Sequence, residues 1–156
     1  LEADIEAVRF EGLELPVKLK VHESVFVPLA KWAMLMSGNY RCITKDGMRS
    51  IKETVHGDLE ASRAVYNWVV NLCQSFGAAE SDLVPFEKYA AAAQQLASPS
   101  SAARALAAGA ANIERVDRLV QTVAAQKGLR LAAIDEIVAL VDARLEKNRQ
   151  AAAQSA

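Results

Sequence analysis

The sequence predicts an all-α fold, a compact bundle of about six helices with at most one extended strand near the N-terminus. Three observations support this prediction. From Ser24 onward, apolar residues recur every three or four positions, which is the spacing of one buried helix face. Ser, Asp and Pro stand at the expected helix starts, and Gly stands at several expected ends. Only residues 13–21 alternate apolar residues with the period of a strand.

Length and composition limit the class of protein. The chain has 156 residues, which fits one domain, and its 18 basic and 19 acidic residues nearly cancel. With 52% hydrophobic residues, disorder is disfavoured, and the balanced charge argues against a general nucleic-acid surface. No apolar run approaches the roughly 18 to 20 residues of a membrane helix. We therefore expect a cytoplasmic globular protein that binds neither nucleic acid nor membrane.

The cysteines and histidines show no metal-ligand spacing. Cys42 and Cys73 are far apart in the sequence and form no CxxC pair. We therefore expect both to be reduced, buried thiols. His22 and His56 have no ligand spacing with each other or with a cysteine, so no zinc site is expected.

The chain is expected to divide into three parts. Residues 1–23 are interpreted as an extended connector, in which Pro16 excludes the predicted strand from the centre of a sheet. Residues 24–149 form the helical domain. The Ala-rich residues 150–156 are expected to fray.

Helix starts and stops define the elements of the helical domain. Ser24 and Asp58 are expected N-caps, and Gly77 is an expected stop. Ser98 is interpreted as an N-cap followed by Pro99 at the first helical position. The predicted helical segments are 25–40, 48–55, 58–77, 86–96, the segment after Ser98, 113–127 and 132–149. The buried faces of the third and last segments are predicted to carry Val65, Val69, Leu72, Cys73 and Phe76, and Ile134, Ile137, Val138, Val141 and Leu145.

One face of the segment 25–40 is the first candidate for chemistry. Lys31, Leu35 and Asn39 are spaced four apart and fall within about an 80° arc, at about 100° per residue. A lysine beside a cleft can donate a proton, and an amide can orient a hydroxyl or carbonyl group. In the alternative interpretation, Lys31 extends into solvent, Asn39 caps the helix end, and Gly38 admits a neighbouring helix.

Two helix starts are further candidates. Ser100 and Ser101 follow Pro99 at a helix start, where free N–H groups and hydroxyls suit a carboxylate or phosphate. Residues 112–117 form a polar helix start after Gly109. Each of these, taken alone, is more often only a capped first turn.

The order of these motifs resembles the C-terminal domain of ketopantoate reductase (2-dehydropantoate 2-reductase), in the 6-phosphogluconate-dehydrogenase-like C-terminal superfamily. That domain opens with a helix that carries Lys and then Asn four and eight residues later. It continues with a long helix ending in Gly, Ser-Ser before a helix, and a polar helix start. The matching residues over about residues 10–148 are Lys31, Asn39, Asp58 to Gly77, Ser100, Ser101, Gly109, Asn112 to Glu114, and Gly128.

The resemblance implies roles for individual residues. Lys31 would be the general acid that protonates the ketone oxygen of the substrate. Asn39 would hold the substrate, and Ser100 or Ser101 would bind its carboxylate.

The chain also departs from the family pattern. Leu35 stands where the family has the first Asn of the lysine helix. Asn112 stands where the family has its catalytic Glu, and a slip of one or two residues would put Ile113 or Glu114 there instead. These departures predict a divergent substrate or altered chemistry.

The implied reaction is the NADPH-dependent reduction of a 2-keto acid to a 2-hydroxy acid, as in pantothenate biosynthesis. No Gly-rich dinucleotide-binding turn occurs in the chain, so the resemblance implies that NADP binds mainly to a separate N-terminal Rossmann domain. Residues 1–23 would connect to that domain, and the isolated chain would be inactive. A homodimer is a further possible assembly of the chain. The alternative function is a non-enzymatic helical module for dimerisation or docking.

Overall fold

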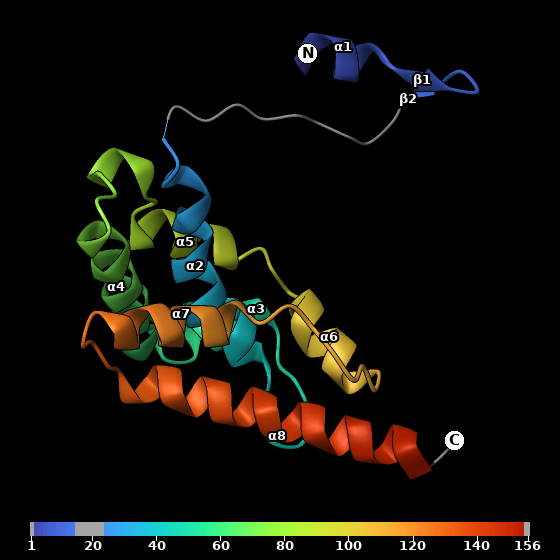
Figure 1. Ribbon diagram of the computed structural model, residues 1–156, viewed down its shortest axis with the longest axis vertical. Coiled ribbons are helices and arrows are strands. Elements are labelled where there is room, and N and C mark those ends of the chain that lie inside the picture. Colours follow the sequence, from blue (N-terminus) through green and yellow to red (C-terminus); the bar gives the residue numbers. More distant parts are fainter. Residues whose placement is uncertain (1, 15–23, 155–156) are drawn as a thin grey trace.

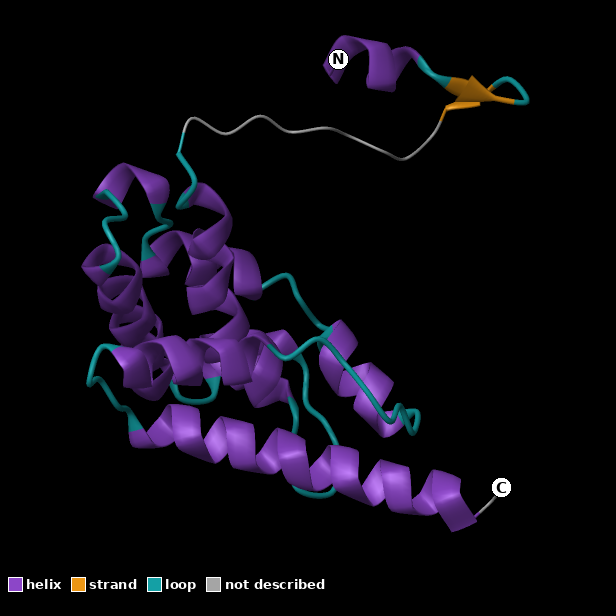
Figure 2. Cartoon of the chain, in the orientation of Figure 1, coloured by secondary structure: helices purple, strands orange, loops and turns teal. Residues whose placement is uncertain are grey.

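The computed structural model describes residues 2–14 and 24–154 and confirms the all-α prediction. These residues contain eight α-helices and one two-stranded sheet. Figure 1 shows α8 running along one side of the bundle, with α7 beside it and α4 and α2 beyond. In Figure 2 the strands of the described residues lie in the N-terminal segment, apart from the helical region.

The N-terminal segment differs from the predicted extended connector. Its elements are α1 (Glu2–Ala7), β1 (Arg9–Phe10) and β2 (Leu13–Glu14). The two strands pair antiparallel across Glu11 and Gly12, which both have positive φ, the conformation that two-residue hairpin turns favour. The alternation from Leu13 therefore begins as one arm of a hairpin. Residues 15–21 of the predicted strand lie outside the described residues.

The helical region agrees with the predicted segments in order and differs at several ends. Its α-helices are α2 (Ala30–Met34), α3 (Ile51–His56), α4 (Leu59–Ser75), α5 (Phe86–Ala93), α6 (Ser101–Ala107), α7 (Val116–Gln126) and α8 (Ala132–Gln154). Short 3₁₀ turns cover Val27–Leu29, Tyr40–Cys42 and Glu80–Asp82, and a π turn covers Leu35–Asn39.

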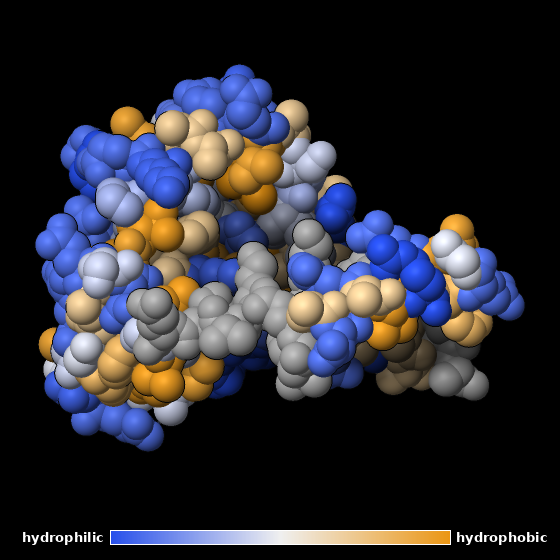
Figure 3. Space-filling view, turned by 90° about the horizontal axis from the view of Figure 1, so that it is seen from above, coloured by the Kyte–Doolittle hydropathy of each residue, from blue (hydrophilic) through white to orange (hydrophobic). Residues whose placement is uncertain are grey.

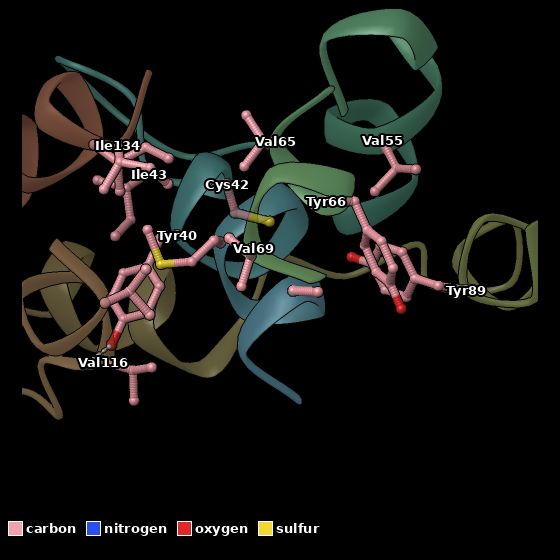
Figure 4. Close-up of a cluster of buried hydrophobic side chains, with 14 of the residues drawn as sticks. Tyr40, Cys42, Ile43, Val55, Val65, Tyr66, Val69, Tyr89, Val116 and Ile134 are labelled. Atoms are coloured by element: carbon pink, nitrogen blue, oxygen red, sulfur yellow. Dashed lines mark hydrogen bonds between the residues drawn. The ribbon is translucent and has the colours of Figure 1, made fainter. Parts of the chain in front are cut away.

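The long helix α4 forms as its sequence pattern predicts. The Asp58 side chain accepts a hydrogen bond from Ala61 N at 2.9 Å, and Gly77 has φ of 107° just beyond the helix end. Val65, Val69, Leu72 and Cys73 are buried as predicted, whereas Phe76 is half-buried against the core. Figure 4 shows side chains of this helix at the centre of the core.

Two tyrosines fill the other end of this core. The rings of Tyr66 and Tyr89 stack with centroids 5.4 Å apart, and Phe86 meets Tyr66 edge-on at 5.3 Å. Burial raises the pKa of both Tyr66 and Tyr89 to about 12, so both phenols remain neutral. The Tyr89 hydroxyl reaches back to Met34 O at 3.3 Å, which connects α5 with α2.

The prediction of one α-helix over residues 25–40 is wrong. A 3₁₀ turn precedes α2, and the chain then widens into the π turn, where the Tyr40 N–H bonds to Leu35 O five residues back. Gly38 sits in this turn against the Tyr89 side chain. The wide turn therefore packs backbone directly against a core aromatic ring, which a helix pattern in the sequence does not reveal.

Two other predicted helix starts are corrected. Helix α3 begins at Ile51, later than the predicted Met48, because Ser50 and Glu53 form a capping box. Helix α6 is capped by Ser100 and not by Ser98. The segment before it is held against α3, because Leu96 O and Ser98 O accept hydrogen bonds from Lys52 N and Ile51 N.

The last helix is longer than predicted. Helix α8 continues to Gln154, beyond the predicted end at residue 149. Its buried face is the predicted one: Ile134, Ile137, Val138, Val141 and Leu145. Beyond this face, Asn148 and Arg149 hydrogen-bond to the loop between α6 and α7, which anchors the last turns of the helix.

The remaining expectations concern single residues and the surface. Cys42 and Cys73 are free and buried, as predicted. No His, Cys, Asp and Glu cluster suited to a metal occurs among the described residues. Within those same residues, no helix combines the length and apolarity needed to cross a membrane. Figure 3 shows hydrophobic side chains in separate patches among hydrophilic ones, and Val25 is 82% exposed.

Candidate functional site

Three of the residues predicted to carry chemistry, Asn39, Ser101 and Asn112, line one cavity of about 290 Å³. It lies where the π turn, the start of α6 and the loop between α6 and α7 meet. Its lining comprises Leu35, Asn39, Tyr40, Ser101, Ala102, Ala105, Asn112, Ile113 and Glu114. Four of these residues are at least partly exposed and have polar side chains that can form hydrogen bonds with a ligand: Asn39, Ser101, Asn112 and Glu114.

The π turn sets the direction of Asn39. In an uninterrupted α-helix, Asn39 would point about 80° away from Lys31. One extra residue in the turn rotates the following chain back by roughly 100°, which brings Asn39 to within about 20° of the Lys31 direction. Leu35 and Asn39 both line the cavity, one turn and two turns beyond Lys31.

The structure separates the two candidate serines. The Ser100 hydroxyl is buried, donates to Asn39 O at 2.7 Å and accepts from Ala103 N at 3.2 Å. Ser100 therefore joins α6 to the π turn through bonds within the protein. Ser101 is exposed and lines the cavity, so its hydroxyl is the one open to a ligand.

The loop that carries Asn112 and Glu114 is held from two sides. On one side, Tyr40 donates to Glu114 O at 2.6 Å and accepts from Val116 N at 3.0 Å, as Figure 4 illustrates for Val116. On the other side, Asn148 donates to Leu106 O and Ala110 O, each at 2.9 Å. Arg149 completes this attachment with bonds to Ala111 O at 3.0 Å and Asn112 Oδ1 at 3.3 Å.

Glu114 is the charged residue in the lining of the cavity.

The Tyr40 hydroxyl has a shifted pKa. Burial raises the pKa of Tyr40, the bond from Val116 N lowers it, and the nearby Asp117 and Glu114 charges raise it. The Tyr40 phenol is therefore a neutral hydrogen-bonding group at neutral pH. With Asn39, Ser101 and Asn112, the cavity offers hydroxyl and amide groups suited to a small oxygen-rich molecule.

Lys31 lies outside this cavity. It is exposed on α2, one turn before Leu35, and does not contribute to the lining. The structure thus brings together Asn39, Ser101 and Asn112 but not Lys31, and it places Ser100 behind the wall. Tyr40 was not among the predicted site residues, because its position in the sequence does not distinguish a cavity residue from a core residue.

Comparison with protein-family models, curated proteins and solved structures gave no match.

The two serines should respond differently to removal of the hydroxyl. We expect Ser100→Ala to lower the free energy of unfolding by about 1–2 kcal/mol, because it removes a helix cap and the bond to Asn39 O. Ser101→Ala should change it by less than about 0.5 kcal/mol. Urea unfolding followed by circular dichroism measures both. Equal losses would contradict the assignment of Ser100 as the structural serine.

Proposed function

We propose that this chain is the C-terminal substrate-binding domain of a ketopantoate-reductase-like, NADPH-dependent oxidoreductase that reduces a 2-keto acid to a 2-hydroxy acid in the cytoplasm. The observation that carries the proposal is the convergence of Asn39, Ser101 and Asn112 on one cavity. These residues come from three separate motifs, and the family order implies that they meet.

In this proposal the chain binds and orients the acid. Ser101 would bind the carboxylate, and Asn39 would hold the carbonyl or hydroxyl oxygen. Lys31 would protonate the ketone oxygen, and its exposed side chain would have to reach the substrate from outside the cavity lining, one turn before Leu35. NADP supplies the hydride when bound, and a separate Rossmann domain would hold it.

The departures from the family suggest a substrate with less polar contact near α2. Leu35 presents an aliphatic wall where the resemblance implies an amide, and Asn112 is neutral where it implies a carboxylate. Glu114 lies in the same lining, so a carboxylate is still present two residues away.

The exposure of Lys31 favours the second candidate function, a non-enzymatic helical module that kept the fold.

Binding of a 2-hydroxy acid tests the proposal on this chain alone. We expect pantoate to shift the backbone amide resonances of Asn39, Ser101 and Asn112 saturably in a nuclear magnetic resonance titration. Ser101→Ala should weaken binding about tenfold, because it removes one hydrogen bond to a charged group. Leu35→Asn should strengthen it by restoring the implied amide.

Ser98→Ala is the matched control, because Ser98 is exposed and lies outside the lining of this cavity. It should leave the affinity for pantoate unchanged. No saturable shift at the cavity, or the same affinity for Ser101→Ala and Ser98→Ala, would contradict the proposed function and favour the helical module.

A further inference from the structure

A second cavity, of about 380 Å³, lies between α4 and the first turns of α8. Its walls are mostly aliphatic, and they comprise Ile43, Ala61, Ala64, Val65, Leu131, Ala133, Ile137 and Leu140. Two arginines, Arg41 and Arg49, line the same space, together with Tyr40 and Glu136. The cavity thus combines two guanidinium groups with an apolar interior.

Arg41 is half-buried and is held by neutral groups. Its Nη1 donates to Ser37 O at 3.1 Å and to Ser62 Oγ at 2.7 Å. Across residues 2–14 and 24–154, no carboxylate lies within ion-pair distance of Arg41 or Arg49. Arg115, which is also partly buried, differs from Arg41 because it forms ion pairs with Asp117 and Asp142.

The fold holds the Arg49 guanidinium against the backbone of Arg41. Arg49 N bonds to Cys42 O at 2.9 Å, and its Nε donates to Arg41 O at 3.1 Å. Burial lowers the pKa of Arg41, and the charge of Arg49 lowers it further, whereas Asp58 raises it. Arg49 is exposed, and its charge also lowers the pKa of Glu53, so its repulsion of the half-buried Arg41 is only partly offset by nearby carboxylates. An anion that contacts both arginines would offset it further.

We propose that this cavity binds a short aliphatic monocarboxylate. The carboxylate would lie between Arg41 and Arg49, which carry donors that no protein group occupies, and the tail would lie against Val65, Ile137 and Leu140. Glu136 lines the cavity and Asp58 acts on Arg41, so a second negative charge on the ligand would be repelled. These acids favour a monoanion over phosphate.

This site is separate from the candidate substrate cavity. The two linings share only Tyr40, and neither Asn39 nor Ser101 contributes to the second. The proposal therefore does not depend on the reductase function.

Titration of the full chain with hexanoate tests the proposal, with hexanamide as the neutral ligand of the same length. We expect hexanoate to shift the amide resonances of Arg41, Arg49 and residues 133–140 saturably. Hexanamide and inorganic phosphate should each bind at least about tenfold more weakly, because the site recognises a single carboxylate charge.

Arg49→Gln is the decisive variant, since Arg49 is exposed and its replacement leaves the core intact. It should weaken hexanoate binding about tenfold, whereas Arg9→Gln, the same change in the N-terminal hairpin, and Ser101→Ala should not. Equal binding of hexanoate and hexanamide, an unaffected Arg49→Gln variant, or no saturation up to about 10 mM would overturn the proposal. Phosphate binding as tight as hexanoate binding would overturn the choice of a monocarboxylate.

Discussion

Asp117→Ala should lower the free energy of unfolding by about 3–5 kcal/mol, the usual cost of removing one partner of a buried ion pair. The Asp117 side chain is 0% exposed and accepts two hydrogen bonds from Arg115, at 2.9 and 2.8 Å. Removing the carboxylate would leave a partly buried guanidinium with Asp142 as its one remaining carboxylate partner. Urea unfolding monitored by circular dichroism gives the free energy directly.

Asp135→Ala is the matched control for this experiment. Asp135 pairs with Arg130, whose side chain is 84% exposed, and accepts a hydrogen bond from Gln121, so its loss should be clearly smaller than that of Asp117. If the two aspartates cost the same, the buried position of Asp117 would not be the source of its contribution.

Gly38→Ala should lower the free energy of unfolding by about 1–3 kcal/mol, the usual cost of overpacking a core. A Cβ atom at Gly38 would lie 1.9 Å from Tyr89 Oη and 3.2 Å from Tyr89 Cζ. The ring cannot move away easily, because Tyr89 is 6% exposed and stacks on Tyr66. Thermal and urea unfolding both report this loss.

Two further variants assign that loss to the contact with Tyr89. Gly47→Ala, where the nearest atom to the new Cβ is Thr44 Oγ1 at 3.7 Å, should cost less than about 0.5 kcal/mol. Tyr89→Phe should recover part of the loss in the Gly38→Ala background, because it removes the atom at 1.9 Å. Losses that simply add in the double variant would exclude the proposed clash.

Elements whose ends are set by nearby residues could be predicted from the sequence. Helix α4 lies between its own Asp58 cap and Gly77, and both signals stand within one turn of the helix ends. The buried face of α8 follows from apolar spacing along a single helix. Such features depend on contacts within a few residues.

Elements whose form depends on distant residues could not be predicted. The π turn packs Gly38 against Tyr89, and the start of α6 is set by the pairing of Leu96 and Ser98 with the first turn of α3. In both cases the deciding partner stands more than forty positions away along the chain. Local propensity favours a longer α-helix and an earlier cap, and tertiary contacts override it.

The candidate site shows the same division. The order of motifs predicted that Lys31, Asn39, Ser100 or Ser101, and Asn112 belong to one site. Asn39, Ser101 and Asn112 line one cavity, whereas Lys31 and Ser100 do not. The role of Tyr40 in anchoring the loop could not be predicted, since its hydroxyl bonds to backbone atoms of Glu114 and Val116. Any residue can offer a backbone N–H or C=O group, apart from the missing N–H of proline, so a hydrogen bond to the backbone leaves no pattern in the sequence.

The attachment of Asn148 and Arg149 to the loop between α6 and α7 has a consequence for biosynthesis. While a ribosome is still making residues 116–147, the carbonyls of Leu106, Ala110 and Ala111 lack their partners from α8. Tyr40 alone can then hold the loop, from the side of Glu114 and Val116. We therefore expect the loop to gain its full set of hydrogen bonds only after Arg149 has left the exit tunnel.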